Sequence, residues 1–239
     1  MINLSARSYQ KELLDNDDIP FADIQQNMKE LNMVNTYLGG HHITVTGIKK
    51  IIHKQPSTEP IHICEIGCGG GDNLHAIHHW CNKKNIPVSF TGIDIKPECI
   101  DFARRQYPGM NATWITSDYQ LVNFNNKPDI IFSSLFCHHF TEAEIMVILL
   151  WMKKNAVKGF FINDLQRHPL AYYSIQLITK LFSRSYLVKN DAPLSVARGF
   201  TKKEWRQVFE QAAIKNYSIE WKWAFRHLIT CNNGSTAKI

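Results

Sequence analysis

Between residues 61 and 163, short apolar runs alternate with stretches of helical pattern, and this rhythm constrains the fold more than any other feature of the chain. The apolar runs are strand-like and lie at residues 61–66, 88–95, 112–115, 129–135 and 159–163. The segments between them have the spacing of amphipathic helices and include residues 75–82, 97–107 and 142–155. Strands that alternate with helices form βαβ units, so we expect a mostly parallel sheet with helices on both faces.

The segment before this region is predicted to be helical. Asp23–Leu38 carries apolar residues at spacings of three and four, and Gly39-Gly40 is expected to end that helix. A second helix is predicted from about Thr46 to His53.

The alternation stops after residue 164. Residues 165–199 form an insertion, in which an apolar helical run (LAYYSIQLITKLF) precedes a turn-rich segment, KNDAPLSV. Thr201 and Glu204 have the spacing of a capping box and predict a helix start. Two further strand-like runs, 217–221 and 224–230, bring the expected number of strands to seven.

We therefore expect a single α/β domain over residues 1–239, with a Rossmann-like sheet of seven mostly parallel strands. Its parts are expected to be an N-terminal helical lid (1–58), a core (59–164), a substrate-lid insertion (165–199) and a C-terminal helix with a strand hairpin (200–239). The insertion is predicted to roof a pocket while packing one side on the core, because an amphipathic helix can do both.

Composition excludes several classes of protein. The net charge of +6 is scattered along the chain, so we expect no nucleic-acid partner. The N-terminus lacks a signal-peptide layout and the longest apolar runs are too short to span a bilayer, so we expect a cytoplasmic protein without stable membrane insertion. Its six cysteines are expected to be free thiols, and the sequence is compatible with a homodimer.

The strongest local signal is ICEIGCGGGDN at residues 63–73, in which a strand carrying Glu65 runs into the glycine-rich segment 67–71. Glycines there allow tight turns and let backbone N–H groups approach a ligand. Asp94 follows 23 residues after Gly71 at the tip of the next strand, where an acid can bind ribose hydroxyls. A third polar position, Ser117-Asp118-Tyr119, follows the third strand and can meet an adenine amino group.

Two other glycine-loop classes do not fit. A short-chain dehydrogenase needs a Tyr-x-x-x-Lys pair, and no tyrosine here has a lysine four residues later. A P-loop needs Gly-Lys-Ser/Thr after the glycines, which is absent.

The combination of E-x-G-x-G-x-G, an acid ending strand two and an acid after strand three resembles class I S-adenosylmethionine (SAM)-dependent methyltransferases over roughly residues 60–165. The resemblance implies SAM as cofactor. It implies that Glu65 organises the loop, that Asp94 binds the ribose and that Asp118 binds adenine. It implies a further set of cofactor-binding residues, comprising Gly67, Cys68, Gly69, Gly71, Ile95, Tyr119, Ser134 and, for the methionine carboxylate, Asn35.

The outer motifs point to a small-molecule acceptor. The N-terminal helices, LFCHHF (135–140), NDLQRHPLAYY (163–173) and DAPLSVARGF (191–200) resemble a bacterial group related to the ubiquinone/menaquinone-biosynthesis methyltransferases. That resemblance implies O-methylation of a phenolic polyketide or quinone-like aromatic, with C-methylation of a quinone-type ring as an alternative. The motif of DNA amino-methyltransferases is absent at 133–136. An RNA or protein methyltransferase and a non-catalytic SAM-binding regulator remain open.

Three histidines at the expected ligand-binding edge are the candidate catalytic residues. His138 and His139 follow strand four, and His168 follows strand five. An imidazole can accept the proton of a phenol or stabilise the phenolate. We expect no metal site, because adjacent histidines match neither helical nor alternating strand geometry for shared ligands.

Overall fold

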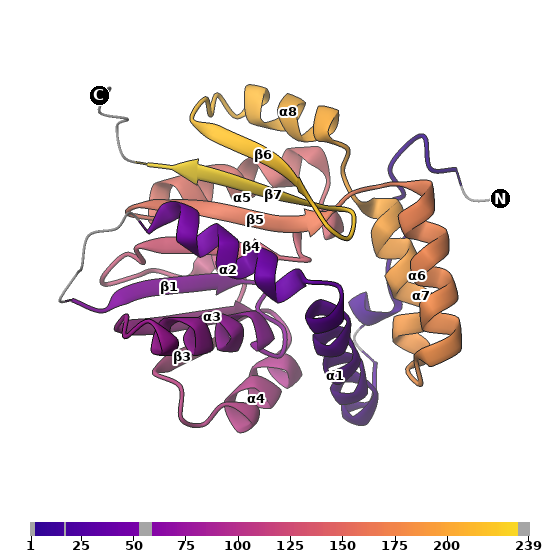
Figure 1. Ribbon diagram of the computed structural model, residues 1–239, viewed down its shortest axis with the longest axis horizontal. Helices are drawn as coiled ribbons and strands as arrows, with labels where there is room; N and C mark the ends of the chain where they lie inside the picture. Colours follow the sequence, from indigo (N-terminus) through magenta and orange to yellow (C-terminus); the bar gives the residue numbers. More distant parts are fainter. Residues whose placement is uncertain (1–2, 17, 53–58, 234–239) are drawn as a thin grey trace.

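A computed structural model describes residues 3–16, 18–52 and 59–233, and its centre is one seven-stranded sheet (Figure 1). The strand order is β3-β2-β1-β4-β5-β7-β6. The first five strands are parallel, while β7 runs antiparallel to both of its neighbours. The strand bounds are β1 (Ile61–Ile66), β2 (Val88–Asp94), β3 (Ala112–Thr116), β4 (Ile130–Ser134), β5 (Gly159–Leu165), β6 (Tyr217–Lys222) and β7 (Arg226–Asn232). The predicted α/β fold with seven mostly parallel strands is confirmed.

Helices cover both faces of the sheet. One face carries α2 (Gly40–Ile51), α3 (Asp72–Lys83) and α4 (Pro97–Gln106), whose buried apolar residues form a core with β1, β2 and β4. The other face carries α5 (Glu142–Asn155) and α8 (Lys202–Gln211), around the buried Trp205 and Phe209. Both helices begin with capping boxes, at Thr141 and, as predicted, at Thr201.

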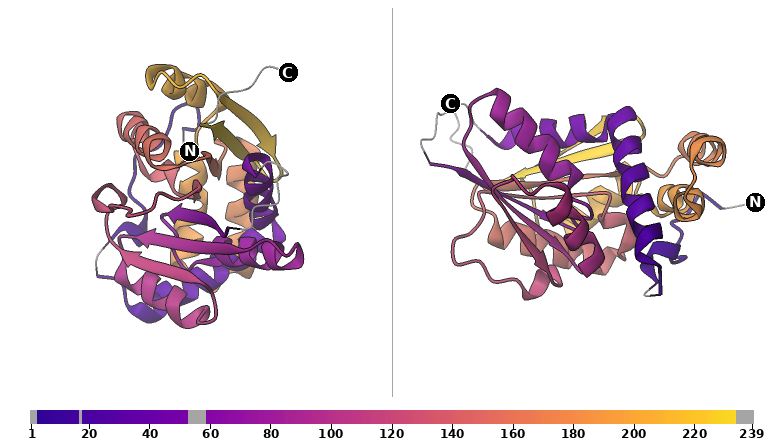
Figure 2. Two further views of the ribbon diagram at one scale, coloured as in Figure 1. Left: turned by 90° about the vertical axis from the view of Figure 1, so that its left-hand side faces the viewer. Right: turned by 90° about the horizontal axis from the view of Figure 1, so that it is seen from below.

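The remaining helices gather at one end of the sheet, where the parallel strands have their carboxyl ends (Figure 2). They are α1 (Phe21–Tyr37), α6 (Pro169–Phe182) and α7 (Tyr186–Arg198). Three short 3₁₀ turns lie in the connections, namely η1 (Leu13–Asp15), η2 (Tyr119–Leu121) and η3 (Cys137–His139). No helix among residues 3–16, 18–52 and 59–233 is long and apolar enough to cross a membrane.

Glu30 joins α1 to the turn between α6 and α7. Its buried carboxylate accepts hydrogen bonds from the Ser183 hydroxyl and from the backbone N–H groups of Arg184 (3.0 Å) and Ser185 (3.1 Å). Burial alone would raise the pKa of Glu30, but these hydrogen bonds and one from Gln26 outweigh it, so the pKa is lowered. The N-terminal helix and the insertion are thereby held together as one cover.

Two local predictions were wrong. The segment KNDAPLSV is not a turn but the middle of α7, where Pro193 lies inside the helix. Burial of Leu187, Val188 and Leu194, with a Ser185 cap, outweighs the missing proline N–H.

The second N-terminal helix begins at Gly40 rather than Thr46. Gly39 takes a left-handed conformation (φ +78°) and redirects the chain in a single residue, so α2 starts at once. Its predicted end at His53 lies outside the described residues.

Candidate functional site

A cavity of about 750 Å³ opens at the carboxyl ends of the strands. It lies where a ligand is expected in an open α/β sheet. The loops after β1, β2, β3 and β4 line it, together with residues of α1, η1, α6 and α7. Of the residues predicted from the sequence to bind cofactor or acceptor, those lining this one cavity are Asn35, Gly67, Cys68, Gly69, Asp94, Ile95, Asp118, Tyr119, Ser134, His138 and His139.

The glycine loop needs its glycines for shape. Gly67 has φ +64°, and a Cβ added there would lie 2.1 Å from the Phe136 ring. The loop is tied to β2 by two hydrogen bonds. The Cys68 N–H donates to the Ile93 carbonyl (3.0 Å), and the Gly69 N–H donates to the Asp94 carboxylate (2.8 Å). The first two elements of the predicted cofactor site are therefore in direct contact.

Asp94 stands at the end of β2 with one oxygen on the glycine loop and the other accepting from the Lys96 N–H (3.0 Å). Burial raises the pKa of its carboxyl group, although the two N–H donors counter that effect. The neighbouring Ile95 is 70% exposed and lines the cavity, so it can pack on a ligand.

The third predicted element, Ser117-Asp118-Tyr119, lines the same cavity as the glycine loop and Asp94. Asp118 caps η2 by accepting the Gln120 N–H (2.9 Å). Tyr119 is buried edge-on against Phe136 and Trp151. Together these residues form a polar edge over an aromatic floor, an arrangement that can hold a nucleobase.

Two predicted residues lie behind the cavity lining rather than in it. Glu65 is fully buried beneath the loop, where desolvation and the charge of Asp72 raise its pKa well above the usual value while Asn73 opposes the shift. Gly71 is the N-terminal cap of α3 at φ +79°, and a Cβ there would meet the Trp114 ring at 2.6 Å. Both positions support the loop from below.

The structure adds Arg226 and Asp72 to the cofactor side, and the sequence analysis had missed both. Asn35 donates to Asp72 (3.1 Å) and accepts from Arg226 Nη2 (2.9 Å), and His41 Nε2 is 2.7 Å from Asp72. Arg226 is buried, which lowers its pKa to about 10. Its Nη1 has no hydrogen-bond partner within the described ranges. Arg226 lines the cavity, and a guanidinium is a donor suited to a ligand carboxylate.

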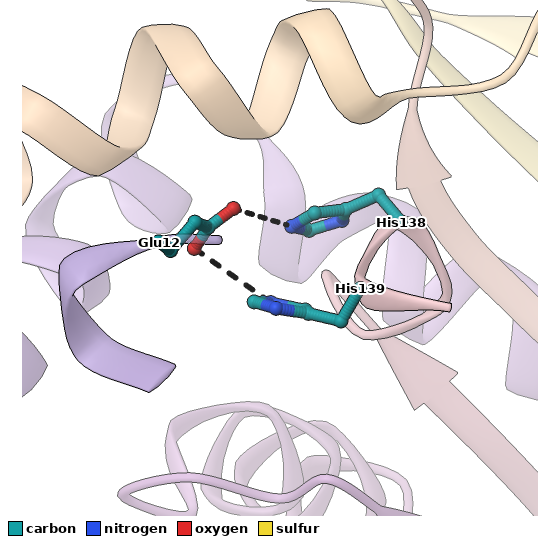
Figure 3. A group of neighbouring side chains, drawn as sticks. All are labelled: Glu12, His138 and His139. Atoms are coloured by element: carbon teal, nitrogen blue, oxygen red, sulfur yellow. Dashed lines mark ion pairs between the residues drawn. The ribbon is translucent and has the colours of Figure 1, made fainter. Parts of the chain in front are cut away.

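The two adjacent histidines meet a glutamate from the N-terminal segment (Figure 3). His138 Nδ1 lies 2.7 Å from the Asp164 carboxylate, and its Nε2 lies 3.6 Å from Glu12. His139 Nε2 lies 3.8 Å from the second Glu12 oxygen, and its Nδ1 lies 3.3 Å from Asp15. The spacing argument against convergence of adjacent histidines was therefore wrong here, because the η3 turn sets the two rings side by side at 4.4 Å.

Two buried arginines fix the backbone of this turn. Arg198 donates to the carbonyls of His138 (3.1 Å) and His139 (2.7 Å). Arg7 donates to the carbonyl of Phe140 (2.8 Å) and stacks over the Phe200 ring. No sequence pattern links these positions, because the partners come from opposite ends of the chain.

His168 is placed differently from the other two candidate histidines. It is the N-terminal cap of α6, where its Nδ1 accepts the Leu170 N–H (3.2 Å), and its ring stacks on Phe225. It is not among the residues that line the cavity. Its proposed catalytic role stays a prediction without support from its position.

A glycine loop after β1, an acid ending β2 and this strand order together define a class I SAM-dependent methyltransferase fold. Residues 63–158 match the family model described as a methyltransferase domain. On these grounds residues 63–158 form a SAM-dependent methyltransferase domain. A comparison with curated proteins found no match.

Solved structures agree with the fold. The plantazolicin methyltransferase BpumL in complex with S-adenosylhomocysteine is 17% identical, with a TM-score of 0.65 over 89% of this chain and 90% of that one. A SAM-dependent methyltransferase from Aquifex aeolicus is 16% identical, with a TM-score of 0.62 over 88% and 98%. Human N-acetylserotonin methyltransferase is 16% identical, with a TM-score of 0.63 over 90% of this chain and 57% of that one.

Proposed function

We propose that the protein methylates a hydroxyl group of a phenolic polyketide or quinone-like aromatic small molecule. The observation that carries this proposal is that the SAM-binding loop and the His138–His139 pair line one cavity. A methyl donor and a proton acceptor thus open onto the same space, as an O-methyltransferase requires.

The remaining cavity wall supports an aromatic acceptor. Leu31 of α1, Ile175 and Ile178 of α6, and Val188 of α7 line it together with Phe140. Such a wall binds a flat apolar body by desolvation, while the few polar groups orient its hydroxyl. A polynucleotide would need a basic groove, and the ring nitrogens of the two histidines face the carboxylates of Glu12, Asp15 and Asp164.

The residues of the cofactor side fit SAM. We assign Asp94 to the ribose hydroxyls, the edge at Asp118 to adenine, and the guanidinium of Arg226, which lines the cavity, to the methionine carboxylate. When bound there, SAM would supply an electrophilic methyl group, with a neutral thioether as its leaving group. The chain itself contributes position and the exclusion of water.

The histidine pair handles the proton of the acceptor. A phenol with a pKa near ~10 reacts faster as its anion, so a base beside the hydroxyl accelerates transfer. Asp164 accepts the Nδ1–H of His138, which leaves Nε2 free to receive that proton at the cavity. The buried carboxylate also stabilises the imidazolium that forms.

We also propose a cytoplasmic location. All six cysteines are buried free thiols, as expected in a reducing compartment.

The test is incubation of purified protein with SAM carrying a labelled methyl group and an organic extract of the source cells, followed by mass spectrometry. We expect one small molecule heavier by one labelled methyl group, whose fragmentation places the label on oxygen. Label on ring carbon would favour C-methylation instead. Label only in RNA or protein would contradict the small-molecule proposal, and SAM binding without any labelled product would favour a regulator.

A further inference from the structure

The cluster of Glu12, His138 and His139 has a geometry that the proton-transfer role alone does not explain. We propose that these three side chains bind a divalent transition-metal ion of the Zn²⁺ type. Each offers one ligand atom, and the three atoms all lie within 4.8 Å of one another. Two imidazoles and one carboxylate form a ligand set found in catalytic zinc sites.

The separations are too long for hydrogen bonds. Glu12 Oε1 is 3.6 Å from His138 Nε2, and Glu12 Oε2 is 3.8 Å from His139 Nε2. A hydrogen bond between such atoms spans about 2.7–3.2 Å. Ligand bonds of about 2.0–2.2 Å in tetrahedral geometry set neighbouring ligand atoms about 3.3–3.6 Å apart. The two glutamate–histidine separations, which involve different Glu12 oxygens, are close to this spacing. One ligand atom from each residue lies within 4.8 Å of the other two, so the three side chains draw closer when they enclose an ion.

The outer nitrogens of both rings face carboxylates. His138 Nδ1 lies 2.7 Å from Asp164, and His139 Nδ1 lies 3.3 Å from Asp15. Metal-binding histidines characteristically donate their second N–H to a carboxylate, which fixes the tautomer. With Nδ1 protonated, each Nε2 presents a lone pair toward Glu12, which itself accepts the Ser195 hydroxyl (2.7 Å). A cation between these lone pairs converts their repulsion into attraction.

The surrounding charge also favours a cation. Glu12, Asp15 and Asp164 face the two imidazoles, while Arg198 is the cationic side chain that contacts Asp15 (3.3 Å). With neutral imidazoles, negative charge is in excess. Nitrogen ligands select a transition metal over Mg²⁺, which prefers an all-oxygen shell.

All three ligand residues line the cavity, so the remaining coordination positions open toward the acceptor. This consequence rests on the proposed function. An acceptor hydroxyl on the ion would lose its proton to water more readily, because a bound divalent ion stabilises the oxygen anion. His138 would then act as a ligand rather than as the base.

The binding test uses protein without a histidine tag, stripped of metal by a chelator and dialysed. Zn²⁺ is titrated by calorimetry, and Co²⁺ is titrated while visible absorption is recorded. We expect one ion per chain, with the intense bands of four- or five-coordinate Co²⁺ lost when Zn²⁺ is added. If neither Zn²⁺ nor Co²⁺ binds stoichiometrically, the proposal is overturned.

The variants Glu12→Gln and His139→Gln are expected to weaken Zn²⁺ binding by at least about 100-fold each, because each removes one of three ligands. The control is His79→Gln, which alters an exposed histidine on α3 away from the cavity. Affinity for S-adenosylhomocysteine and the melting temperature verify that every variant is folded. Undiminished Zn²⁺ affinity in both folded ligand variants would equally overturn the site.

A simple phenol separates this inference from the proposed function. Catechol added to the Co²⁺ form is expected to shift the visible spectrum as its oxygen enters an open position. A spectrum that catechol leaves unchanged, in protein that binds Co²⁺ through Glu12 and His139, would support the metal site and contradict a phenolic acceptor. Methyl transfer to a phenol by protein that binds no metal would support the proposed function and contradict the metal site.

Discussion

The two sides of the cavity are built in different ways. The cofactor side comes largely from consecutive strand ends, with the glycine loop after β1 bonded to Asp94 at the end of β2. The acceptor side joins Glu12 near the N-terminus, His138 in η3 and Asp164 at the end of β5, under a cover of α6 and α7. Apart from Asn35 and Arg226, the cofactor side is thus formed by segments close in sequence, whereas the acceptor side joins segments that are far apart in the chain.

This difference shows which sequence changes each side of the cavity can tolerate. Many enzymes bind the same cofactor with the same short motif, so the cofactor side consists of a recognisable pattern of glycines and acids. Acceptors differ between enzymes, and a wall made from distant segments can change without touching the motif. Substitutions should therefore separate into those that affect SAM binding and those that affect methyl transfer alone.

The largest difference between the effect on methyl transfer and the effect on cofactor binding is expected from Asp164→Asn. The amide cannot fix the His138 tautomer as the carboxylate does, so the turnover number should fall by roughly 10²–10⁴-fold. Affinity for S-adenosylhomocysteine, measured by calorimetry, should stay within a few-fold of wild type. A parallel loss of cofactor affinity would show that the two sides are coupled through β5.

The reverse pattern is expected from Asp94→Ala. Removing charge-assisted hydrogen bonds worth about 1.5–3 kcal/mol each should weaken SAM binding by about 100-fold. Asp101→Ala, an exposed acid on α4 paired with Arg104, is the matched control and should bind SAM normally. Calorimetry on both variants, with circular dichroism as a folding check, makes the comparison. Unchanged affinity in Asp94→Ala would remove the motif assignment.

The variant Arg226→Lys tests whether a residue far from the glycine loop in sequence also contributes to cofactor binding. If Arg226 binds the methionine carboxylate, the variant should bind S-adenosylhomocysteine about 10-fold more weakly, because lysine lacks the forked donors. Methylthioadenosine, which has no carboxylate, should bind both proteins equally. Equal losses for the two ligands would indicate that Arg226 supports the site only by packing.

The smallest effect is expected from Glu30→Gln, which loosens the cover shared by both sides. Losing charge-assisted hydrogen bonds to the α6–α7 turn should lower the free energy of unfolding by about 1–2 kcal/mol at pH 7. The folded-state pKa of Glu30 is below its ordinary value, so this contribution is present above that value and lost as pH falls through the folded pKa.

Urea denaturation at pH 7 and at successively lower pH should therefore show the gap between wild type and Glu30→Gln closing in acid. A gap that widened instead would mean that Glu30 is protonated in the fold. Hydrogen exchange at residues 183–185 should rise in the variant and remain at wild-type levels in the strand core.

The sequence predicted the sheet well because strand and helix periodicities are local properties. The predicted strands lie within a few residues of the observed ones, and the spacing of the loop and its acids assigns them to one site. The acceptor side was predicted only in part. His138 and His139 follow from their place after β4, but nothing near Glu12 or Arg226 indicates a site, since their roles depend on tertiary contacts. The turn predicted around Pro193 was wrong for the same reason, because the helix that contains this proline is stabilised by burial in the tertiary structure.

The antiparallel strand β7 has a consequence for the order in which the molecule is completed. Among the described residues it is the last strand in sequence, yet it lies between β5 and β6, and β6 pairs there with no other strand. During synthesis, β6 therefore emerges before its pairing partner β7 and cannot join the sheet until β7 has been made. Arg226 is on that strand, so a nascent chain would carry the glycine loop early and gain the contact between Arg226 and Asn35 only after β7 has been made.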